Sequence, residues 1–421
     1  MKPTRTLAAL TMGALLVLPA GVTAAPPTAA ASSGVVSERA VSWTPHVLDG
    51  SVKDILRVGD TVVVAGDFHR VADADQGRTH TRRNVFAFEH GTGEILRGFA
   101  PDVSGPVHSL VEGPGGTVVI GGHFSAVNGS ASRGLARLSL ADGRARPEFD
   151  ATIDNGVTYR MAGDGDDLYV GGSFSGVGGE ARHGIARIDT ATGEVDTGFA
   201  PRIEEQRRGE LRVHELALSP AGDRLVINGT FTRVDGHDRY QIAMLDTADG
   251  SVTPWSTSAF EPDCDYSRMQ TYMRRMDFSP DGSYFAVVTA GGPTVKPGLC
   301  KSVTRFENTD RAGARPTWSN LTGGDSLYSV EVTDSAVYVG GHQRWMDNES
   351  GALNAGPGSV EREGIAAVDP RTGRALPWNP GRARGHGVEA LYATDGGLYV
   401  GSDTERLAGA YHGRLGMFPT T

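Results

Sequence analysis

Ionisable and aromatic side chains recur at one point in a series of short apolar segments, close to where each segment begins. Together these residue types indicate a polar pocket for an anionic or sugar ligand. His108 and His214 with Glu215 could instead act as general acid and base. The structural alternative is a wet channel whose charges neutralise one another. The candidate ligand-binding residues are Lys53, His108, Tyr159, His214, Glu215, Arg274, Arg275 and Glu389. Asp54, Arg160, Tyr328 and His386 lie at or beside the same positions and belong to the same polar set.

Common metal and cofactor motifs are missing from the sequence. The 12 histidines include no His-Glu-x-x-His motif and no Cys/His cluster, so we predict no metal site and no cofactor. The stretch LYVGGSFSGVGG (168–179) resembles a phosphate loop, but no helix follows it and it lacks Gly-Lys-Ser/Thr. We therefore assign its glycines to positive φ or close backbone contacts, and we assign no catalytic residue.

The stretch at 168–179 is one copy of a repeat that must position these side chains. Its relatives are TVVVAGDF (61–68), TVVIGGHF (117–124), LVINGTF (225–231), VYVGGH (337–342) and LYVGSD (398–403), with a degenerate copy at 284–292. Neighbouring copies are about 50 to 60 residues apart. Each unit contains short apolar segments separated by Gly, Asp and Pro turns, which is typical of antiparallel strands.

Four short strands per unit at this period predict an all-β, seven-bladed β-propeller with four-stranded antiparallel blades. The last unit ends without its fourth strand, and AVSWTPHV (40–47) near the N-terminus looks like the missing one. We therefore expect the N-terminal strand to pair into the last blade and close the ring. On this interpretation residues 39–421 form a single propeller domain.

The form Leu-Tyr-Val-Gly-Gly-x-Phe, followed by Arg, Ile-Ala-Arg-Leu-Asp and Thr-Gly, resembles secreted bacterial β-propeller repeat proteins, sometimes called delta-sixty repeat proteins. It is similar, more distantly, to kelch propellers and to the repeats of fungal cortical polarity markers. The resemblance covers about residues 40–419. It implies a propeller and export from the cell, and it implies no general catalytic motif.

The N-terminus has the pattern of a secretory signal. Lys2 and Arg5 precede a short apolar run, and small residues near Ala25 offer a cleavage site. We predict a signal peptide at 1–25, a flexible leader at 26–38 and a secreted, extracellular, monomeric protein. No later run approaches the ~20 apolar residues of a membrane helix. The net charge of −10 argues against a nucleic-acid partner.

Two regions depart from the repeat. Residues 256–301 hold both cysteines, Cys264 and Cys300, and in an exported chain these predict one disulfide, with two free thiols as the alternative. The second departure is a long loop at 343–362. Long loops on rigid scaffolds often bind partners, although tolerated drift explains them equally well.

Arginines also recur by unit, at Arg133, Arg182, Arg239 and Arg362. Repetition favours a structural role, such as bonding to loop carbonyls, over a ligand site in every unit.

We predict a non-catalytic binding module for an extracellular protein or glycan. The alternative is a hydrolase or lyase that acts on an extracellular polymer at the entrance of the central channel. A structural envelope component, with no pocket, is a third interpretation.

Overall fold

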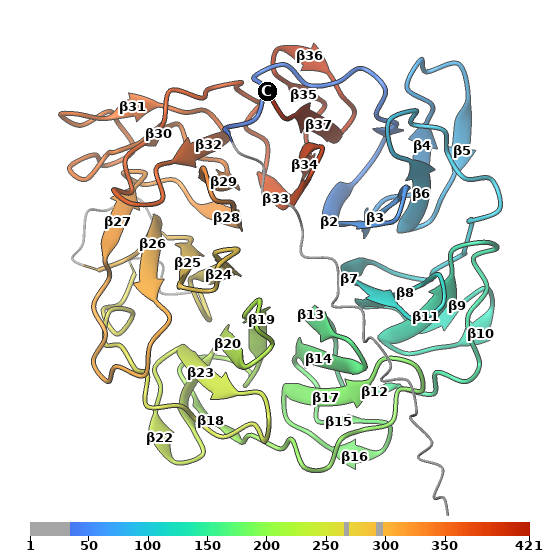
Figure 1. Cartoon of the computed structure of the whole chain (residues 1–421), viewed down its shortest axis with the longest axis horizontal. Coiled ribbons are helices and arrows are strands. Elements are labelled where there is room, and N and C mark those ends of the chain that lie inside the picture. Colours follow the sequence, from blue (N-terminus) through green and yellow to red (C-terminus); the bar gives the residue numbers. More distant parts are fainter. Residues whose placement is uncertain (1–33, 265–268, 292–297) are drawn as a thin grey trace, which may run out of the picture.

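The computed structural model describes residues 34–264, 269–291 and 298–421, and within these ranges the chain forms strands and turns without a helix. The expected signal peptide lies outside the described residues. Sheets surround a central axis (Figure 1). No described helix is long and apolar enough to cross a membrane.

Seven of the described sheets share one antiparallel order of first, middle and third strand. The first strands are β2 (Ser51–Val58), β7 (Val107–Gly113), β13 (Thr158–Asp164), β19 (Val213–Leu218), β24 (Met273–Phe278), β28 (Leu327–Val332) and β33 (Val388–Thr394). The middle strands are β3 (Thr61–Asp67), β8 (Thr117–Gly122), β14 (Asp167–Gly172), β20 (Arg224–Gly229), β25 (Tyr284–Thr289), β29 (Val337–Gly341) and β34 (Gly397–Ser402). The third strands are β6 (Val85–Glu89), β11 (Leu135–Ser139), β17 (Ile185–Asp189), β23 (Ile242–Asp246), β26 (Ser302–Glu307), β32 (Ile365–Val368) and β37 (Leu415–Pro419).

The first strands are innermost, and each contacts the first strand of the next sheet (Figure 1). β33 of the last sheet also contacts β2 of the first. Apolar side chains fill the spaces between neighbouring sheets, so each middle strand is buried on both faces. This double burial explains why the middle strands are nearly continuous apolar runs rather than alternating ones.

Gly171 and Gly172 of the repeat are required by close packing. A Cβ on Gly171 would lie 2.9 Å from Leu216 in the next sheet, and one on Gly172 would lie 2.1 Å from the carbonyl oxygen of Val157. Neither glycine has a positive φ. Of the two structural reasons that we expected, close approach is therefore the one that applies here.

Small outer hairpins, which the sequence analysis did not predict, occupy the connections between middle and third strands. They are β4 (Arg70–Ala72) and β5 (Thr79–Thr81), β9 (Ala126–Val127) and β10 (Ser130–Ala131), β15 (Gly176–Val177) and β16 (Glu180–Ala181), β21 (Phe231–Val234) and β22 (His237–Asp238), β30 (Trp345–Met346) and β31 (Val360–Glu361), and β35 (Arg406–Leu407) and β36 (Ala410–Tyr411). Three are joined by β1 (His46–Val47), β12 (Ile153–Asp154) and β18 (Ile203–Gln206).

The prediction of four-stranded blades was wrong for most units. Only β24, β25 and β26 are extended by a fourth strand, β27 (Trp318–Leu321), among the described residues. In five other units the fourth segment makes one isolated bridge, as at Ile95 and Val195. A proline follows two to six residues after each bridge, as at Pro254 and Pro201, and proline has no N–H to continue a ladder.

The repeated arginines hold these short segments in place. The guanidinium groups of Arg182, Arg239 and Arg362 donate hydrogen bonds to the carbonyl oxygens of Asp196, Thr253 and Leu376, respectively. These carbonyls belong to the fourth segments, so the structural role is confirmed for these three arginines. Arg133 is exposed and makes no such bond among the described residues.

The N-terminal segment bonds to the last sheet. The backbone N–H groups of Ser37 and Val41 donate to the carbonyl oxygens of Pro419 and Met417 in β37, at 2.8 and 2.9 Å. Val36 is only 4% exposed, so packing begins within the predicted leader and before residue 39. β1, at the other end of the expected strand, pairs with β4 of the first unit instead.

Candidate functional site

Each of the seven first strands shifts its register against the middle strand at one point. The side chains at the shift belong to Lys53, His108, Tyr159, His214, Arg274 with Arg275, Tyr328 and Glu389. A β-bulge leaves an extra residue unpaired and re-aims its side chain. The repeat therefore places one re-aimed residue, or two, on every first strand.

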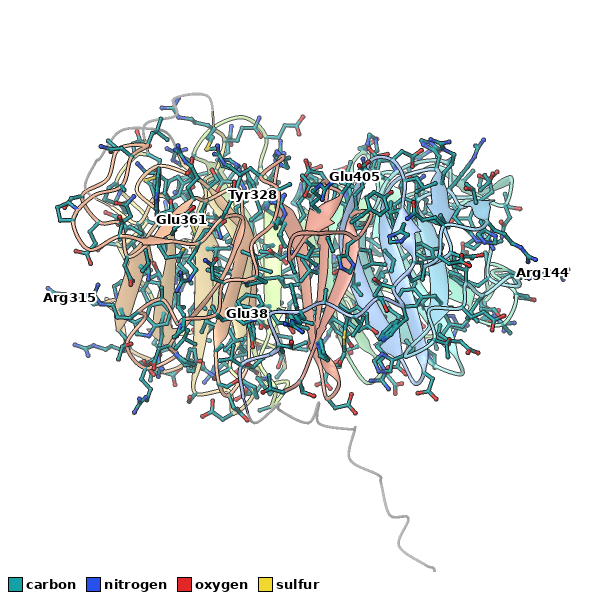
Figure 2. All side chains as sticks on the ribbon, turned by 90° about the horizontal axis from the view of Figure 1, so that it is seen from above. Glu38, Arg144, Arg315, Tyr328, Glu361 and Glu405 are labelled. Atoms are coloured by element: carbon teal, nitrogen blue, oxygen red, sulfur yellow. A yellow bond between two sulfur atoms is a disulfide. The ribbon has the colours of Figure 1, made fainter. Side chains whose placement is uncertain are left out.

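These side chains converge on one cavity of about 480 Å³. Its lining comprises all eight residues selected from the sequence, together with Met269, Tyr328 and His386. Tyr328 lies toward one face of the disc in the side view (Figure 2). The volume is within the range of small-molecule sites, roughly 300–1,000 Å³. The structure thus brings the predicted residues together, and their binding role remains a prediction.

Three flat rings stack along one wall of the cavity. The ring centroids of His108 and Tyr159 are 6.1 Å apart with planes at 23°, and those of Tyr159 and His214 are 5.7 Å apart at 25°. Arg212 donates to the hydroxyl of Tyr159 at 3.1 Å and orients it. The sequence analysis missed Arg212, which precedes its first strand by one residue.

A second stack faces the cavity from the sixth and seventh units. The ring of Tyr328 lies 4.7 Å from that of His386, with planes at 17°. The guanidinium of Arg274 lies 5.9 Å from the centroid of Tyr328, in cation–π geometry. The Tyr328 hydroxyl is 3.2 Å from Nδ1 of His342, which fixes the ring from behind.

Glu389 is neutralised at the rim of the cavity. Its Oε2 lies 2.6 Å from Nζ of Lys53, and its Oε1 lies 3.8 Å from Nε2 of His386. Lys53 and Glu389 come from the first and last units, so this ion pair depends on those units being adjacent.

A second layer of charges lies deeper in the channel, where arginines and carboxylates alternate. Arg160 lies 3.0 Å from Asp54 and 2.8 Å from Glu215, and Arg275 lies 3.7 and 3.6 Å from the same two carboxylates. Burial raises the pKa of Glu215 against the opposing effect of the arginines. This layer matches the structural alternative from the sequence analysis, a channel whose charges neutralise one another. Within it, Glu215 pairs with two arginines rather than with a histidine.

Further acids line the channel below, at positions that the sequence analysis missed. Asp277 accepts a hydrogen bond from the backbone N–H of Val332, and Glu331 accepts one from that of Ala393. Each bond crosses to the next sheet. Asp277 follows Arg275 by two residues, and side chains two residues apart on a strand share one face. This alternation could have placed Asp277 on the channel side from the sequence.

Both cavity histidines of the first stack are held neutral. Burial lowers the pKa of His108, and burial together with Arg274 and Arg212 lowers the pKa of His214 to about 3. Nδ1 of His214 is buried without a hydrogen-bond partner in the described structure. Neutral imidazoles can donate and accept hydrogen bonds, but they add no charge to the cavity.

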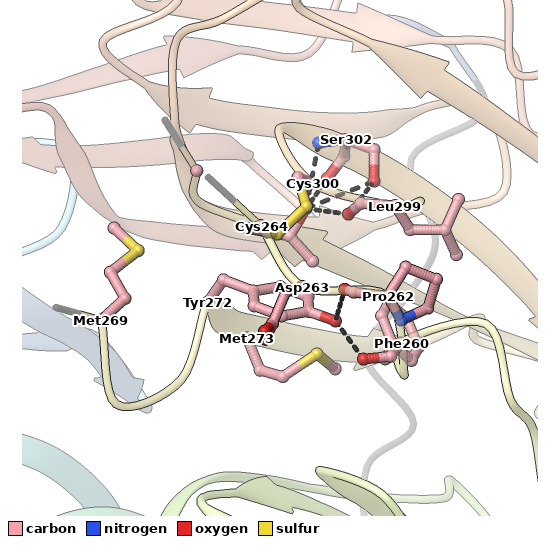
Figure 3. Close-up of a disulfide and its surroundings, with 12 residues drawn as sticks. Phe260, Pro262, Asp263, Cys264, Met269, Tyr272, Met273, Leu299, Cys300 and Ser302 are labelled. Atoms are coloured by element: carbon pink, nitrogen blue, oxygen red, sulfur yellow. Dashed lines mark hydrogen bonds between the residues drawn. A yellow bond between two sulfur atoms is a disulfide. The ribbon is translucent and has the colours of Figure 1, made fainter. Parts of the chain in front are cut away.

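The region at 256–301 contributes both to the cavity and to a predicted covalent link. Cys264 and Cys300 form a disulfide with a Cα–Cα distance of 5.8 Å (Figure 3), which confirms that pairing. Beside it, the Tyr272 hydroxyl donates to the carbonyl oxygens of Phe260 and Pro262. None of the described residues of the 343–362 loop lines the cavity.

Comparisons with known proteins support the architecture. A family described as "Domain of unknown function (DUF5122) beta-propeller" matches residues 114–144 and 167–199. The WD40 beta propeller domain of Doa1 is similar in structure, with a TM-score of 0.51 and 10% sequence identity over 91% of this chain and 97% of that one. The computationally designed Ika8 protein gives a TM-score of 0.45 and 13% identity over 88% and 96% of the two chains. No curated protein matches the sequence.

The family match and the similarity to the Doa1 propeller domain identify an all-β protein of propeller type. They bear on the fold and not on a ligand, because the sequence identity to both solved structures is low.

Proposed function

We propose that the protein is a seven-bladed β-propeller, of the LYVGGxF repeat type, that acts as a non-catalytic binding module. The seven sheets of first, middle and third strands are the blades, and residues 37–41 close the ring against β37. The contact between β2 and β33 supports this closure. The signal-like N-terminus supports secretion, so the partner is extracellular.

The observation that carries the binding function is the register shift in all seven first strands. Some bulged side chains join neighbouring sheets, as Nδ1 of His108 does with the carbonyl oxygen of Thr158 at 2.9 Å, but the pairing of the strands does not itself require a bulge. In this chain the bulges direct four ring systems, three cations and one carboxylate into the same cavity. We propose that this cavity binds the end of an extracellular glycan, since hydroxyl-rich ligands require many donors and acceptors around a compact volume.

A hydrolase or lyase that acts on an extracellular polymer is the second candidate. Nδ1 of His214 has no hydrogen-bond partner among the described residues, so it is open to a proton donor, but a pKa of about 3 makes this imidazole a weak base at neutral pH. The arrangement of His108, His214 and Glu215 argues against a coupled dyad, because Tyr159 separates the histidines and Glu215 is paired with arginines.

A glycan array followed by thermal-shift titration tests the proposal on the mature protein. His214→Ala and Arg274→Ala should each weaken an array-positive glycan at least tenfold. Arg144→Ala, at a side chain 84% exposed, should leave its affinity unchanged. If a glycan binds both cavity variants with the same affinity as the wild type, the proposal that it binds in the cavity is contradicted. New reducing ends after incubation with the bound polymer would favour the enzyme.

A further inference from the structure

The cations of the cavity differ in how they are paired. Lys53 forms the 2.6 Å ion pair with Glu389, and Arg275 is shared between Asp54 and Glu215. Arg274 forms no ion pair with any described residue. It is therefore the cavity cation whose charge is left without a fixed counter-charge.

Arg274 is nevertheless held in position. Its Nη1 donates to the carbonyl oxygens of Thr271 and Met273, at 3.1 and 2.7 Å. Its own carbonyl accepts a hydrogen bond from Asn228, which is fully buried. The planar head lies over Tyr328, while Nε and Nη2 have no hydrogen-bond partner among the described residues. The guanidinium is thus held through Nη1, while Nε and Nη2 can donate two parallel hydrogen bonds to the two oxygens of a carboxylate.

The balance of charges around the cavity favours a ligand that carries one negative charge. Glu389 balances Lys53, Asp54 and Glu215 balance Arg160 and Arg275, and the two histidines of the first stack, His108 and His214, are neutral. Among the described residues around the cavity, Arg274 therefore contributes one unbalanced positive charge, in a chain with a net charge of −10. Burial also lowers the pKa of Arg274, as expected for a cation removed from water. An anionic ligand would offset this desolvation.

The rest of the lining fits a sugar better than a simple carboxylic acid. The stacks of Tyr159 with His214 and of Tyr328 with His386 border a cavity that also offers Glu389 and Lys53 as hydrogen-bond partners. A pyranose has apolar C–H groups that can contact the rings and a rim of hydroxyls for polar side chains. Its carboxylated derivatives add one negative charge.

We propose that the cavity selects a carboxylated sugar residue, a uronic acid, and that Arg274 binds its carboxylate through Nε and Nη2. This inference rests on the proposed binding function and names its ligand class. The remaining hydroxyls contact the stacked rings and the Lys53–Glu389 pair.

Isothermal titration calorimetry with three probes tests this assignment. The probes are methyl glucuronoside, its uncharged methyl ester and methyl glucoside, and galacturonate replaces glucuronate in a second series. The wild-type protein should bind the acid at least tenfold more tightly than the ester. Arg274→Gln should reduce that ratio to about one, and Arg274→Lys should restore part of it. Arg144→Gln is the matched control on an exposed arginine, and thermal unfolding checks that each variant is folded.

The possible outcomes separate the two proposals. Equal binding of acid and ester, lost in His214→Ala, would overturn the uronic acid and leave the binding cavity standing. Binding of the acid that survives both Arg274→Gln and His214→Ala would overturn the cavity itself. Failure of every acid probe to bind the wild type, or tighter binding of inorganic phosphate, would also overturn this inference.

Discussion

Asp277 and Glu331 show how single residues in the channel serve the fold rather than a ligand. Each carboxyl accepts a backbone N–H from the next sheet, at 2.6 and 2.7 Å, and so joins two neighbouring sheets at the axis. Burial raises the pKa of Asp277 to about 7, and burial with the nearby Asp277 raises the pKa of Glu331. At neutral pH these acids retain protons that they would lose in the unfolded chain.

This retention predicts a pH-dependent stability. Between the ordinary pKa of 3.8 and about 7, the folded state binds the extra proton of Asp277, so its contribution to stability falls as pH rises. Asp277→Asn removes the titrating carboxyl and its pH-dependent contribution, and its side-chain oxygen can still accept the hydrogen bond from the N–H of Val332. The free energy of unfolding of the variant, minus that of the wild type, should rise with a slope of up to about 1.4 kcal/mol per pH unit.

Urea unfolding at several values between pH 4.5 and 7.5 measures this difference. The comparison with the wild type is necessary because His214, held neutral in the fold, contributes the opposite slope over much of the same range. Asp238→Asn, at a side chain 96% exposed, is the control and should give no slope. If the free energies of unfolding of Asp277→Asn and of the wild type change with pH in the same way, the raised pKa of Asp277 is contradicted.

At the scale of single elements, turns decide how the units connect. The turn after β6 contains Gly91 and Gly93, both with positive φ, at 83° and 73°. A Cβ on Gly91 would meet nothing within 4 Å, whereas one on Gly93 would lie 1.7 Å from the carbonyl oxygen of Trp43. The same turn therefore has one glycine needed for its conformation and one needed also for close approach of the N-terminal segment.

The two glycines make a matched pair of substitutions. Gly91→Ala should cost only backbone strain, about 1–2 kcal/mol. Gly93→Ala should cost clearly more, on the order of 3 kcal/mol or above, because the backbone at Trp43 must also move. Urea unfolding of both variants provides the measurement. If both substitutions lower the free energy of unfolding equally, the N-terminal segment does not pack against this turn.

On the scale of the whole molecule, the N-terminal segment covers the edge of the last sheet. Besides the bonds to β37, the hydroxyl of Tyr338 accepts from the N–H of Val36 at 2.9 Å, and the indole of Trp378 donates to the carbonyl of Ser37 at 3.1 Å. Cores form between all neighbouring sheets, including one that joins the last sheet to the first. An uncovered strand edge would invite pairing with another chain.

Truncation tests this role. A chain that begins at Pro45 lacks the segment, and each lost hydrogen bond costs about 1 kcal/mol in addition to the lost apolar burial. It should melt several degrees lower and associate in size-exclusion chromatography with light scattering. A chain that begins at Gly34 keeps every described contact and should behave as the untruncated protein does. Identical behaviour of the two truncated chains would contradict closure by this segment.

Much of the site could be predicted because it follows from the repeat. Residues near the start of each first strand, such as Lys53 and His214, were selected without knowledge of their neighbours, and all of the selected residues line the cavity. The short fourth segments were harder to predict. Their apolar pattern is strand-like, but whether a ladder forms depends on the position of proline relative to the neighbouring strand.

The sequence by itself determined the all-β class, the repeating unit and the positions that face the axis, because these follow from local periodicity and repetition. It favoured one disulfide, and the structure decided between that disulfide and two free thiols. Only the tertiary structure decided which charges meet. Lys53 and Glu389 are 336 residues apart and pair because the first and last units are adjacent. The neutrality of His214, and the fact that Arg274 forms no ion pair with the described residues, depend on burial and on side chains from other sheets, which no local pattern encodes.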